Sequence, residues 1–179
     1  MSHILIVYST IDGQTRRICE RIAIICREAG SGVDVVELAQ LDETRLAEYD
    51  KILLGASIRY GRHRPAVQAF VQRYQALLHQ KVSGFFSVNA VARKADKNTP
   101  QTNPYMQKFF AETDWQPDCL AVFAGRIIYP EYGFFDRNII RFIMWLTKGP
   151  TNVTQRFEFT DWQKVDAFAA QFATMMVEK

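Results

Sequence analysis

The sequence predicts an α/β fold in which five parallel strands form a doubly wound sheet with helices on both faces. Apolar runs of strand length alternate with longer segments whose apolar residues recur at helical spacing. The 179 residues, of which 48% are hydrophobic, suffice for one domain with a full-sized core. No repeat, low-complexity segment or linker divides the chain, so we expect a single domain over residues 1–179.

The first half of the chain contains three of the predicted strands. A strand over about His3–Tyr8 is followed by a helix over about Gly13–Ala29, and Gly30 provides the C-terminal glycine signal. Val33–Leu38 is the second strand, and Tyr49–Ala56 contains the third. These elements form the start of a β-α-β pattern, which favours parallel pairing.

Four further elements are expected at about Ala66–His79 (helix), Val82–Val88 (strand), Gln101–Thr113 (helix) and Cys119–Ala124 (strand). Pro65 stands at a favourable first position of the earlier helix. Thr160 and Gln163 fit a capping box, so we expect the last helix to begin at Thr160. The five strands fit the sheet order 2-1-3-4-5, which places a ligand beyond the carboxyl ends of the strands, beside the first strand.

Composition limits the classes of function. A net charge of +3 without a long basic run gives no support to nucleic acid binding, and we expect none. Cys19, Cys26 and Cys119 have no metal or redox spacing, so we expect no metal site and three small, reduced core residues. No apolar run reaches the roughly 20 residues that span a bilayer. A strand begins almost at the N-terminus, so we expect no signal peptide and a cytoplasmic protein.

The segment Ser9–Thr15 joins the first predicted strand to the first helix. Hydroxyl groups and free backbone N–H groups at a helix N-terminus form an anion site, for which phosphate is the usual ligand. The segment has one glycine and no lysine, unlike a dinucleotide or P-loop motif. We therefore expect it to bind the phosphate of a mononucleotide such as FMN, through Ser9, Thr10, Asp12, Gly13, Gln14 and Thr15. The alternative is an ordinary turn with Asp12 or Ser9 as N-cap.

The segment Ser57–Arg64 follows the third strand and combines an aromatic residue, a glycine and three arginines. Tyr60 can stack on a planar ring, and Gly61 lets the backbone approach that ring. We expect this cofactor contact to involve Ser57, Ile58, Arg59, Tyr60 and Gly61. The arginines Arg59, Arg62 and Arg64 can hold carboxylates. The alternative is a solvated basic loop, in which His63 is a surface residue.

A third polar segment, Asn89–Thr99, follows the fourth strand. Asn89 can hydrogen-bond to ring heteroatoms, and we group it with Ser87 and Val88, which precede it, as cofactor contacts. Arg93 and Lys94 add positive potential, whereas Lys97 is expected in solvent. The three segments meet at the same edge of the predicted sheet, which favours a bound mononucleotide.

An insertion over residues 125–159 separates the fifth strand from the last helix and is too long for a plain connection. Within it we expect a helix over Asp136–Lys148 that is apolar around most of its surface, with Arg137, Arg141 and Lys148 on one stripe. At roughly 20 Å it is too short to span a bilayer. We expect it to lie flat in a membrane interface or to face an apolar substrate. The alternative is a helix buried at the sheet edge or in a contact between two copies of the chain.

The sequence resembles the short, flavodoxin-like protoporphyrinogen IX dehydrogenases of bacteria, which are quinone-dependent enzymes of haem biosynthesis. The resemblance covers essentially the whole chain, and its matching segments are Ser9–Thr15, Gly55–Gly61, Ser87–Lys94, Thr99–Asn103 and Thr160–Trp162. Flavodoxins usually have threonine where this chain has Asp12. Because a carboxylate facing a phosphate is repulsive, we expect Asp12 to cap the helix.

The resemblance implies an oxidoreductase with an FMN cofactor, a protoporphyrinogen IX donor and a menaquinone or ubiquinone acceptor. It implies a flavodoxin-like sheet and a peripheral membrane protein on the inner face of the cell membrane. Tyr60 and His63 are candidates for proton transfer. The candidate partners of the substrate propionates are Arg59, Arg62, Arg64, Arg93 and Lys94.

Two other functions remain open on the same fold. One is a flavodoxin-type electron carrier, although the usual acidic surface of such carriers is missing from this chain. The other is a soluble NAD(P)H:quinone reductase. The number of copies in the assembly is open, and a homo-oligomer is one possibility.

Overall fold

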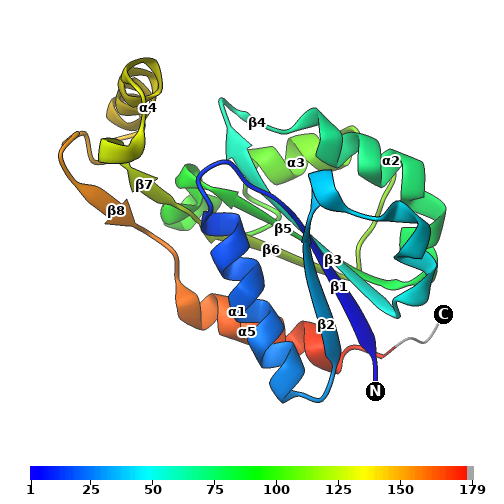
Figure 1. Ribbon diagram of the computed structural model, residues 1–179. Coiled ribbons are helices and arrows are strands. Elements are labelled where there is room, and N and C mark those ends of the chain that lie inside the picture. The colour runs from blue at the N-terminus through cyan, green and yellow to red at the C-terminus, as the bar shows by residue number, and fades with distance from the viewer. Residues whose placement is uncertain (177–179) are drawn as a thin grey trace.

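The computed structural model describes residues 1–176 and contains the predicted parallel sheet. Residues 177–179, the end of the predicted domain 1–179, lie outside the described range. Five strands pair in parallel in the order β2-β1-β3-β5-β6, which confirms the predicted topology (Figure 1). These strands are β1 (His3–Ser9), β2 (Gly32–Glu37), β3 (Lys51–Arg59), β5 (Val82–Asn89) and β6 (Cys119–Ala124).

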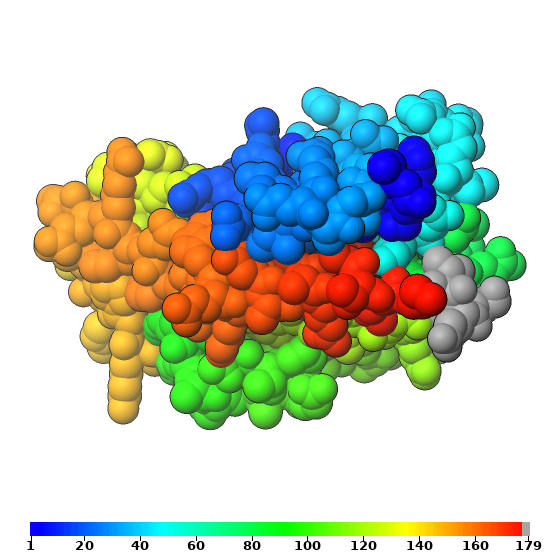
Figure 2. Space-filling model, turned by 90° about the horizontal axis from the view of Figure 1, so that it is seen from below, coloured from blue at the N-terminus to red at the C-terminus, as the bar shows by residue number. Residues whose placement is uncertain are grey.

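Two layers of helices cover the sheet. Helices α1 (Gln14–Glu28) and α5 (Trp162–Thr174) pack side by side on one face, as Figures 1 and 2 show. Helices α2 (Pro65–Gln80) and α3 (Pro104–Ala111) lie on the other face. Each face has its own buried apolar cluster. All three cysteines are free and buried, which confirms the prediction of small core residues.

The sequence suggested a loop over Ser57–Arg64. In the structure this segment is instead the end of β3 followed by a hairpin. Strand β3 continues to Arg59 because Ser57 still pairs with Val88 of β5, and β4 (Arg62–His63) then pairs antiparallel to β3. The two turn residues, Tyr60 and Gly61, both have positive φ angles, 51° and 79°. A two-residue turn of this kind matches the twist of a hairpin.

Two helices begin later than predicted, because different residues cap them. In α3 the Asn103 side chain accepts hydrogen bonds from the N–H groups of Tyr105 and Met106, and Pro104 follows at the first helical position. In α5 the cap is Asp161, while the Thr160 hydroxyl donates to the Ala124 carbonyl. The predicted capping box at Thr160 is therefore wrong. Short 3₁₀ helices occur at η1 (Leu38–Gln40), η2 (Glu43–Glu48), η3 (Ala90–Arg93), η4 (Ala95–Lys97) and η5 (Tyr129–Glu131).

The insertion folds as a small unit at the carboxyl edge of the sheet (Figure 1). Strands β7 (Arg126–Ile128) and β8 (Arg156–Glu158) form an antiparallel pair, which the sequence did not predict. Between them lies α4 (Phe134–Leu146), close to the predicted 136–148. A cluster separate from the two sheet cores holds the unit together, and its buried members are Ile127, Tyr129, Tyr132 and Met144. Among the helices of residues 1–176, none is long and apolar enough to cross a membrane.

Candidate functional site

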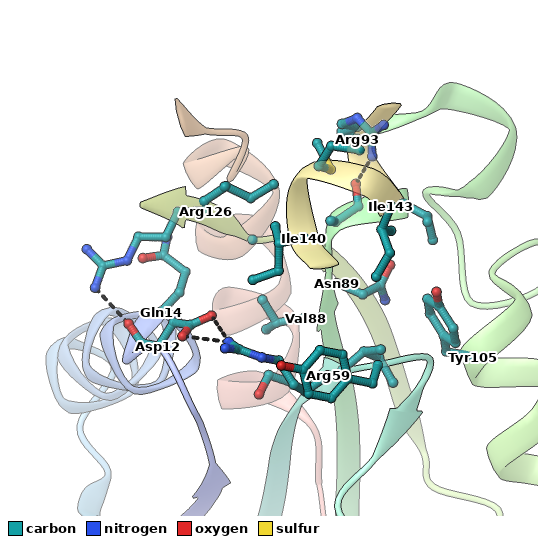
Figure 3. A pocket seen from close by; sticks show the side chains of 18 of the residues that line it. Asp12, Gln14, Arg59, Val88, Asn89, Arg93, Tyr105, Arg126, Ile140 and Ile143 are labelled. Atoms are coloured by element: carbon teal, nitrogen blue, oxygen red, sulfur yellow. Dashed lines mark hydrogen bonds and ion pairs between the residues drawn. The ribbon is translucent and has the colours of Figure 1, made fainter. Parts of the chain in front are cut away.

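A large cavity, here called the main cavity, opens where the carboxyl ends of β1, β3 and β5 meet the insertion (Figure 3). It encloses about 890 Å³ of space, a figure that includes its open mouth. Residues of the turn after β1, of the β3–β4 hairpin, of the start of η3 and of α4 all line it. The three predicted segments therefore contribute to one site, as expected from the sheet order.

The turn after β1 has the features of a phosphate site. Gly13 precedes α1 in the left-handed region, and no side chain caps the first turn of the helix. The Thr10 hydroxyl accepts a hydrogen bond from the Gly13 N–H at 3.0 Å, which closes the turn. Thr15 is fully buried, yet its hydroxyl has no partner within the described part of the chain. Since buried hydroxyls are normally paired, an anion at the N-terminus of α1 would supply the missing partner.

Asp12 does not cap the helix, so that expectation is wrong. The Nη1 atom of Arg59 donates to both carboxylate oxygens of Asp12, at 2.8 and 2.9 Å, and turns this carboxylate away from the helix. The Nη2 atom of Arg59 donates to Asp136 of α4 at 2.9 Å, and the Tyr60 hydroxyl bonds to the same carboxylate. Arg59 therefore ties the turn to the insertion.

Ion pairing sets the pKa values of Arg59 and Asp136. Burial alone would lower the pKa of Arg59, but the two carboxylates outweigh that effect and raise it. The hydrogen bond from Tyr60 lowers the pKa of Asp136, so this carboxylate is ionised at neutral pH. The predicted partner of a propionate, Arg59, is thus already engaged by two carboxylates of the chain.

The hairpin divides the predicted residues between separate hollows. Ser57, Ile58, Arg59, Tyr60 and Gly61 line the main cavity. Arg62 and His63 instead line a neighbouring hollow, which we call the hairpin cavity and which shares Ile58, Gly61 and Tyr105 with the main cavity. Arg64 and Ser9 line a third hollow beside β2. Arg62 pairs with Arg59 across the hairpin, but neither Arg62 nor Arg64 lines the main cavity, which differs from the prediction.

His63 is half-buried rather than at the surface, which corrects the sequence-based expectation. Its ring packs edge-on against Phe85 and Phe109, and its Nε2 atom lies 2.9 Å from the Ser87 hydroxyl. Burial lowers the pKa of His63 to about 4, so the ring is neutral at pH 7. Ser87 in turn accepts a hydrogen bond from the side chain of Asn89, which lines the main cavity.

Arg93 lines the main cavity, but its guanidinium group is used for structure. Nη1 donates to the Ala90 carbonyl at 2.7 Å, and Nη2 donates to the carbonyl and hydroxyl oxygens of Thr147, at 2.9 Å each. Burial lowers the pKa of Arg93. The residue therefore holds the end of α4 over the cavity. Of the remaining predicted residues, Gln14 and Val88 line the main cavity, whereas the described lining does not include Gly13, Ser87 or Lys94.

Sequence reasoning missed several residues of the cavity wall. The roof is the inner face of α4 with the residue that follows it, and Ile140, Ile143, Met144 and Thr147 follow helical spacing, which was the available signal. Tyr105 from α3 and Tyr132 from the insertion complete the wall. Arg126 also lines the cavity, and its place directly after the carboxyl end of β6 was the signal that could have identified it.

Known proteins share this architecture and sequence. The flavodoxin domain family matches residues 5–154. Protoporphyrinogen IX dehydrogenase (quinone) of Escherichia coli K12 is 43% identical over 169 residues, which cover 94% of this chain and 93% of that protein. The protein of the same name from Leishmania major is 45% identical over 172 residues, covering 96% of this chain and 74% of that one. The solution structure of two-electron reduced Megasphaera elsdenii flavodoxin superposes with a TM-score of 0.60 and 16% identity, covering 96% and 99% of the two chains, and so shares the fold.

Proposed function

This chain belongs to the flavodoxin domain family and, within it, to the protoporphyrinogen IX dehydrogenases (quinone), and from this premise we propose how its cavity serves that activity. The protein is an FMN-dependent oxidoreductase that oxidises protoporphyrinogen IX to protoporphyrin IX and passes the electrons to a quinone. The observation that carries the proposal is the main cavity, in which a phosphate site and an apolar roof face each other.

The residues of the turn after β1 fit the phosphate of FMN. The Thr15 hydroxyl lacks a partner, and the first N–H groups of α1 have none within the helix. Tyr60, which is 51% exposed at the cavity mouth, is available to stack on the flavin ring. When bound, FMN supplies a ring that accepts hydride and passes electrons on to a quinone. Asn89 lines the same cavity, but its side chain is engaged within the chain, since its amide nitrogen donates to Ser87 and its oxygen accepts from the Ala92 N–H.

The insertion fits a large apolar substrate. Ile140, Ile143 and Met144 of α4 form a roof over the cavity, and the bonds from Arg93 to Thr147 hold the end of that helix in place. Such a roof excludes water from the reacting face of the cofactor. The Tyr60 hydroxyl is committed to Asp136, so we assign Tyr60 to ring stacking rather than to proton transfer.

Anaerobic addition of substrate tests the activity. Purified protein reconstituted with FMN is mixed with protoporphyrinogen IX, and the flavin absorbance is followed before a quinone is added. We expect the flavin band to bleach with protoporphyrinogen and to recover with quinone. Bleaching by NADPH instead would favour an NAD(P)H:quinone reductase. Bleaching by neither donor, with reduction only through a partner protein, would favour an electron carrier.

We further propose that the outer face of α4 rests on a membrane surface, where a lipid-soluble quinone is found. Phe134, Phe135 and Trp145 are 74%, 79% and 66% exposed. Arg141 and Lys148 are exposed near this face. Arg137 is not part of a free basic stripe, because its Nη2 atom donates to the Tyr132 carbonyl. An amphipathic helix of this kind lies in an interface with its basic residues at the headgroups.

Vesicle co-sedimentation tests this contact. The triple variant Phe134→Ser, Phe135→Ser, Trp145→Ser is compared with Ile24→Ser, which changes a side chain 45% exposed on α1. We expect the triple variant to lose binding to anionic vesicles at low salt and the control to retain it. Equal sedimentation of both variants and the parent would refute the membrane contact. A change of oligomeric state in the triple variant alone would assign the face to a second copy of the chain.

A further inference from the structure

Arg126 lies over the turn that precedes α1, although it comes from the insertion (Figure 3). It is the first residue of β7, and its Nη2 atom donates to the Asp12 carbonyl at 2.9 Å. The same atom lies 3.6 Å from the position that a Cβ atom on Gly13 would occupy. The guanidinium group is thus in contact with the backbone of the proposed phosphate site.

The hydrogen-bonding capacity of Arg126 is largely unused. Its buried Nε atom has no partner among the described residues, and a buried donor on a charged group is seldom left unpaired. Thr15, fully buried in the same turn, also has a hydroxyl without a partner. Two unpaired polar groups from distant parts of the chain therefore meet in one cavity.

Arg126 has no carboxylate partner within residues 1–176, although one lies opposite it. Glu158 is its cross-strand neighbour in the β7–β8 pair. The Glu158 carboxylate instead accepts hydrogen bonds from Gln14, Arg17 and Trp162. Among the described residues Arg126 forms no ion pair with this carboxylate and donates instead to the Asp12 carbonyl of the turn, so its role is not to neutralise a charge within the insertion.

The charges around the turn explain why a cation is needed there. Asp12 and Asp136 share the single guanidinium of Arg59, so these three side chains together carry an excess negative charge. A phosphate monoester carries about −1.5 to −2 charge at neutral pH. Without another cation, the carboxylate of Asp12 would repel the ligand that the turn is shaped to hold.

From these observations we infer that Arg126 supplies the positive charge of the phosphate site. Its guanidinium group binds the phosphate of the flavin cofactor and not the flavin ring. The inference rests on the proposed FMN binding. It also links the two regions of the molecule, because the residue that holds the phosphate begins the insertion that roofs the cavity. A guanidinium group binds phosphate oxygens through two N–H donors at once.

Flavin titration of the apoprotein tests the inference with two ligands that differ only in the phosphate, FMN and riboflavin. We expect Arg126→Gln to weaken FMN binding by about tenfold or more, as for loss of a charged hydrogen bond. Riboflavin binding should be unchanged, and Arg126→Lys should restore part of the FMN affinity. The control Arg16→Gln removes an equal charge from the first turns of α1, where Arg16 pairs with Glu20, and should leave both affinities unchanged.

Each other outcome overturns the inference. Equal weakening of FMN and riboflavin would mean that Arg126 acts on the ring or on the fold. Unchanged FMN affinity with a raised KM for protoporphyrinogen would make a substrate propionate the anion. If the parent protein bound neither flavin, the proposed function itself would fail, which is a distinct result. Circular dichroism of the apo variants excludes misfolding as the cause.

Discussion

Helices α4 and α5 have the same length, 13 residues each, but they differ in what covers their apolar side chains. α5 buries Val165, Phe168, Ala169 and Phe172 in the sheet core. α4 buries only Met144 and leaves seven large apolar side chains exposed, namely Phe134, Phe135, Ile139, Phe142, Ile143, Trp145 and Leu146. The more apolar of the two helices is therefore the less covered.

This difference distinguishes the sheet region, whose helices are needed for the fold, from the insertion, whose helix leaves its apolar surface available for another contact. Each large apolar side chain buried by α5 stabilises the fold by roughly 1.5–3 kcal/mol, and α4 forgoes most of that gain. An exposed apolar surface of this kind marks a contact with something outside the fold. We therefore assign cofactor binding to the sheet region and access of substrate and quinone to the insertion.

Removal of the insertion tests the proposed division of roles between the two regions most directly. Ile128 and Arg156 are paired in the β7–β8 hairpin, so residues 129–155 can be replaced by a two-residue turn. Because the turn after β1 and Arg126 remain, we expect FMN to stay bound. Without the roof, oxidation of protoporphyrinogen should fall by about a hundredfold or more. Flavin titration and a porphyrin fluorescence assay measure the two effects, and loss of FMN would contradict the division of roles.

The stability of the sheet region should depend on pH through His63, which hydrogen-bonds to Ser87 and packs against Phe85 and Phe109. The pKa of His63 is about 4 in the folded protein, against an ordinary value of 6.5. Below pH 6.5 the unfolded chain therefore binds a proton that the folded chain does not. The contribution of the neutral His63 ring to the free energy of unfolding is fully present above that pH and is lost as the pH falls towards 4. At pH 5 the loss is about 2 kcal/mol.

Urea unfolding at pH 7 and pH 5 measures this loss, with His63→Gln as the control. The variant lacks the titrating group, so its free energy of unfolding should fall less between the two pH values. Parallel pH profiles for the parent and the variant would show that His63 is protonated equally in both states.

Two substitutions test the contact between the regions. Arg59→Ala leaves the Asp12 carboxylate unpaired beside the phosphate site, so FMN affinity should fall by about tenfold. Asp136→Asn removes the half-exposed carboxylate that pairs with Arg59 and accepts from Tyr60, and it should raise the KM for protoporphyrinogen by up to about fivefold. FMN affinity should be unchanged in Asp136→Asn. Equal effects of both variants on FMN would mean that the two regions bind the cofactor together.

The sheet and the position of the turn after β1 could be predicted because their signals are local. The fifth predicted strand, Cys119–Ala124, agrees with β6 residue for residue, since an apolar run bounded by polar residues is sufficient evidence of a buried strand. The turn after β1 was found from hydroxyl and glycine spacing alone. The β3–β4 hairpin was missed because Tyr60 has a positive φ angle, which a non-glycine residue seldom adopts.

The rest of the site depends on contacts that are distant in the sequence. Arg93 and Thr147 lie 54 positions apart, and Arg126 and Asp12 lie 114 apart. Strands β7 and β8 contain only three residues each, which is too short for a periodic pattern. The sequence identifies arginines as candidate anion partners. It does not indicate which of them are already engaged by carboxylates or carbonyl groups of the same chain.

Lys148 at the end of the insertion helix combines a strained backbone with a charge near the exposed apolar face. Lys148 follows the end of α4 with a φ angle of 56°, where glycine is favoured and other residues are strained. Lys148→Gly should stabilise the end of α4 by about 1 kcal/mol, seen as slower hydrogen exchange of its last amides. If the exposed face meets anionic lipid, the variant should also bind vesicles about fivefold more weakly, since one charge near the surface contributes about 1 kcal/mol. Arg141→Gln removes a charge without changing the backbone, so it should weaken vesicle binding and leave hydrogen exchange unchanged. Slower exchange with undiminished vesicle binding in Lys148→Gly would mean that the lysine has no part in the membrane contact.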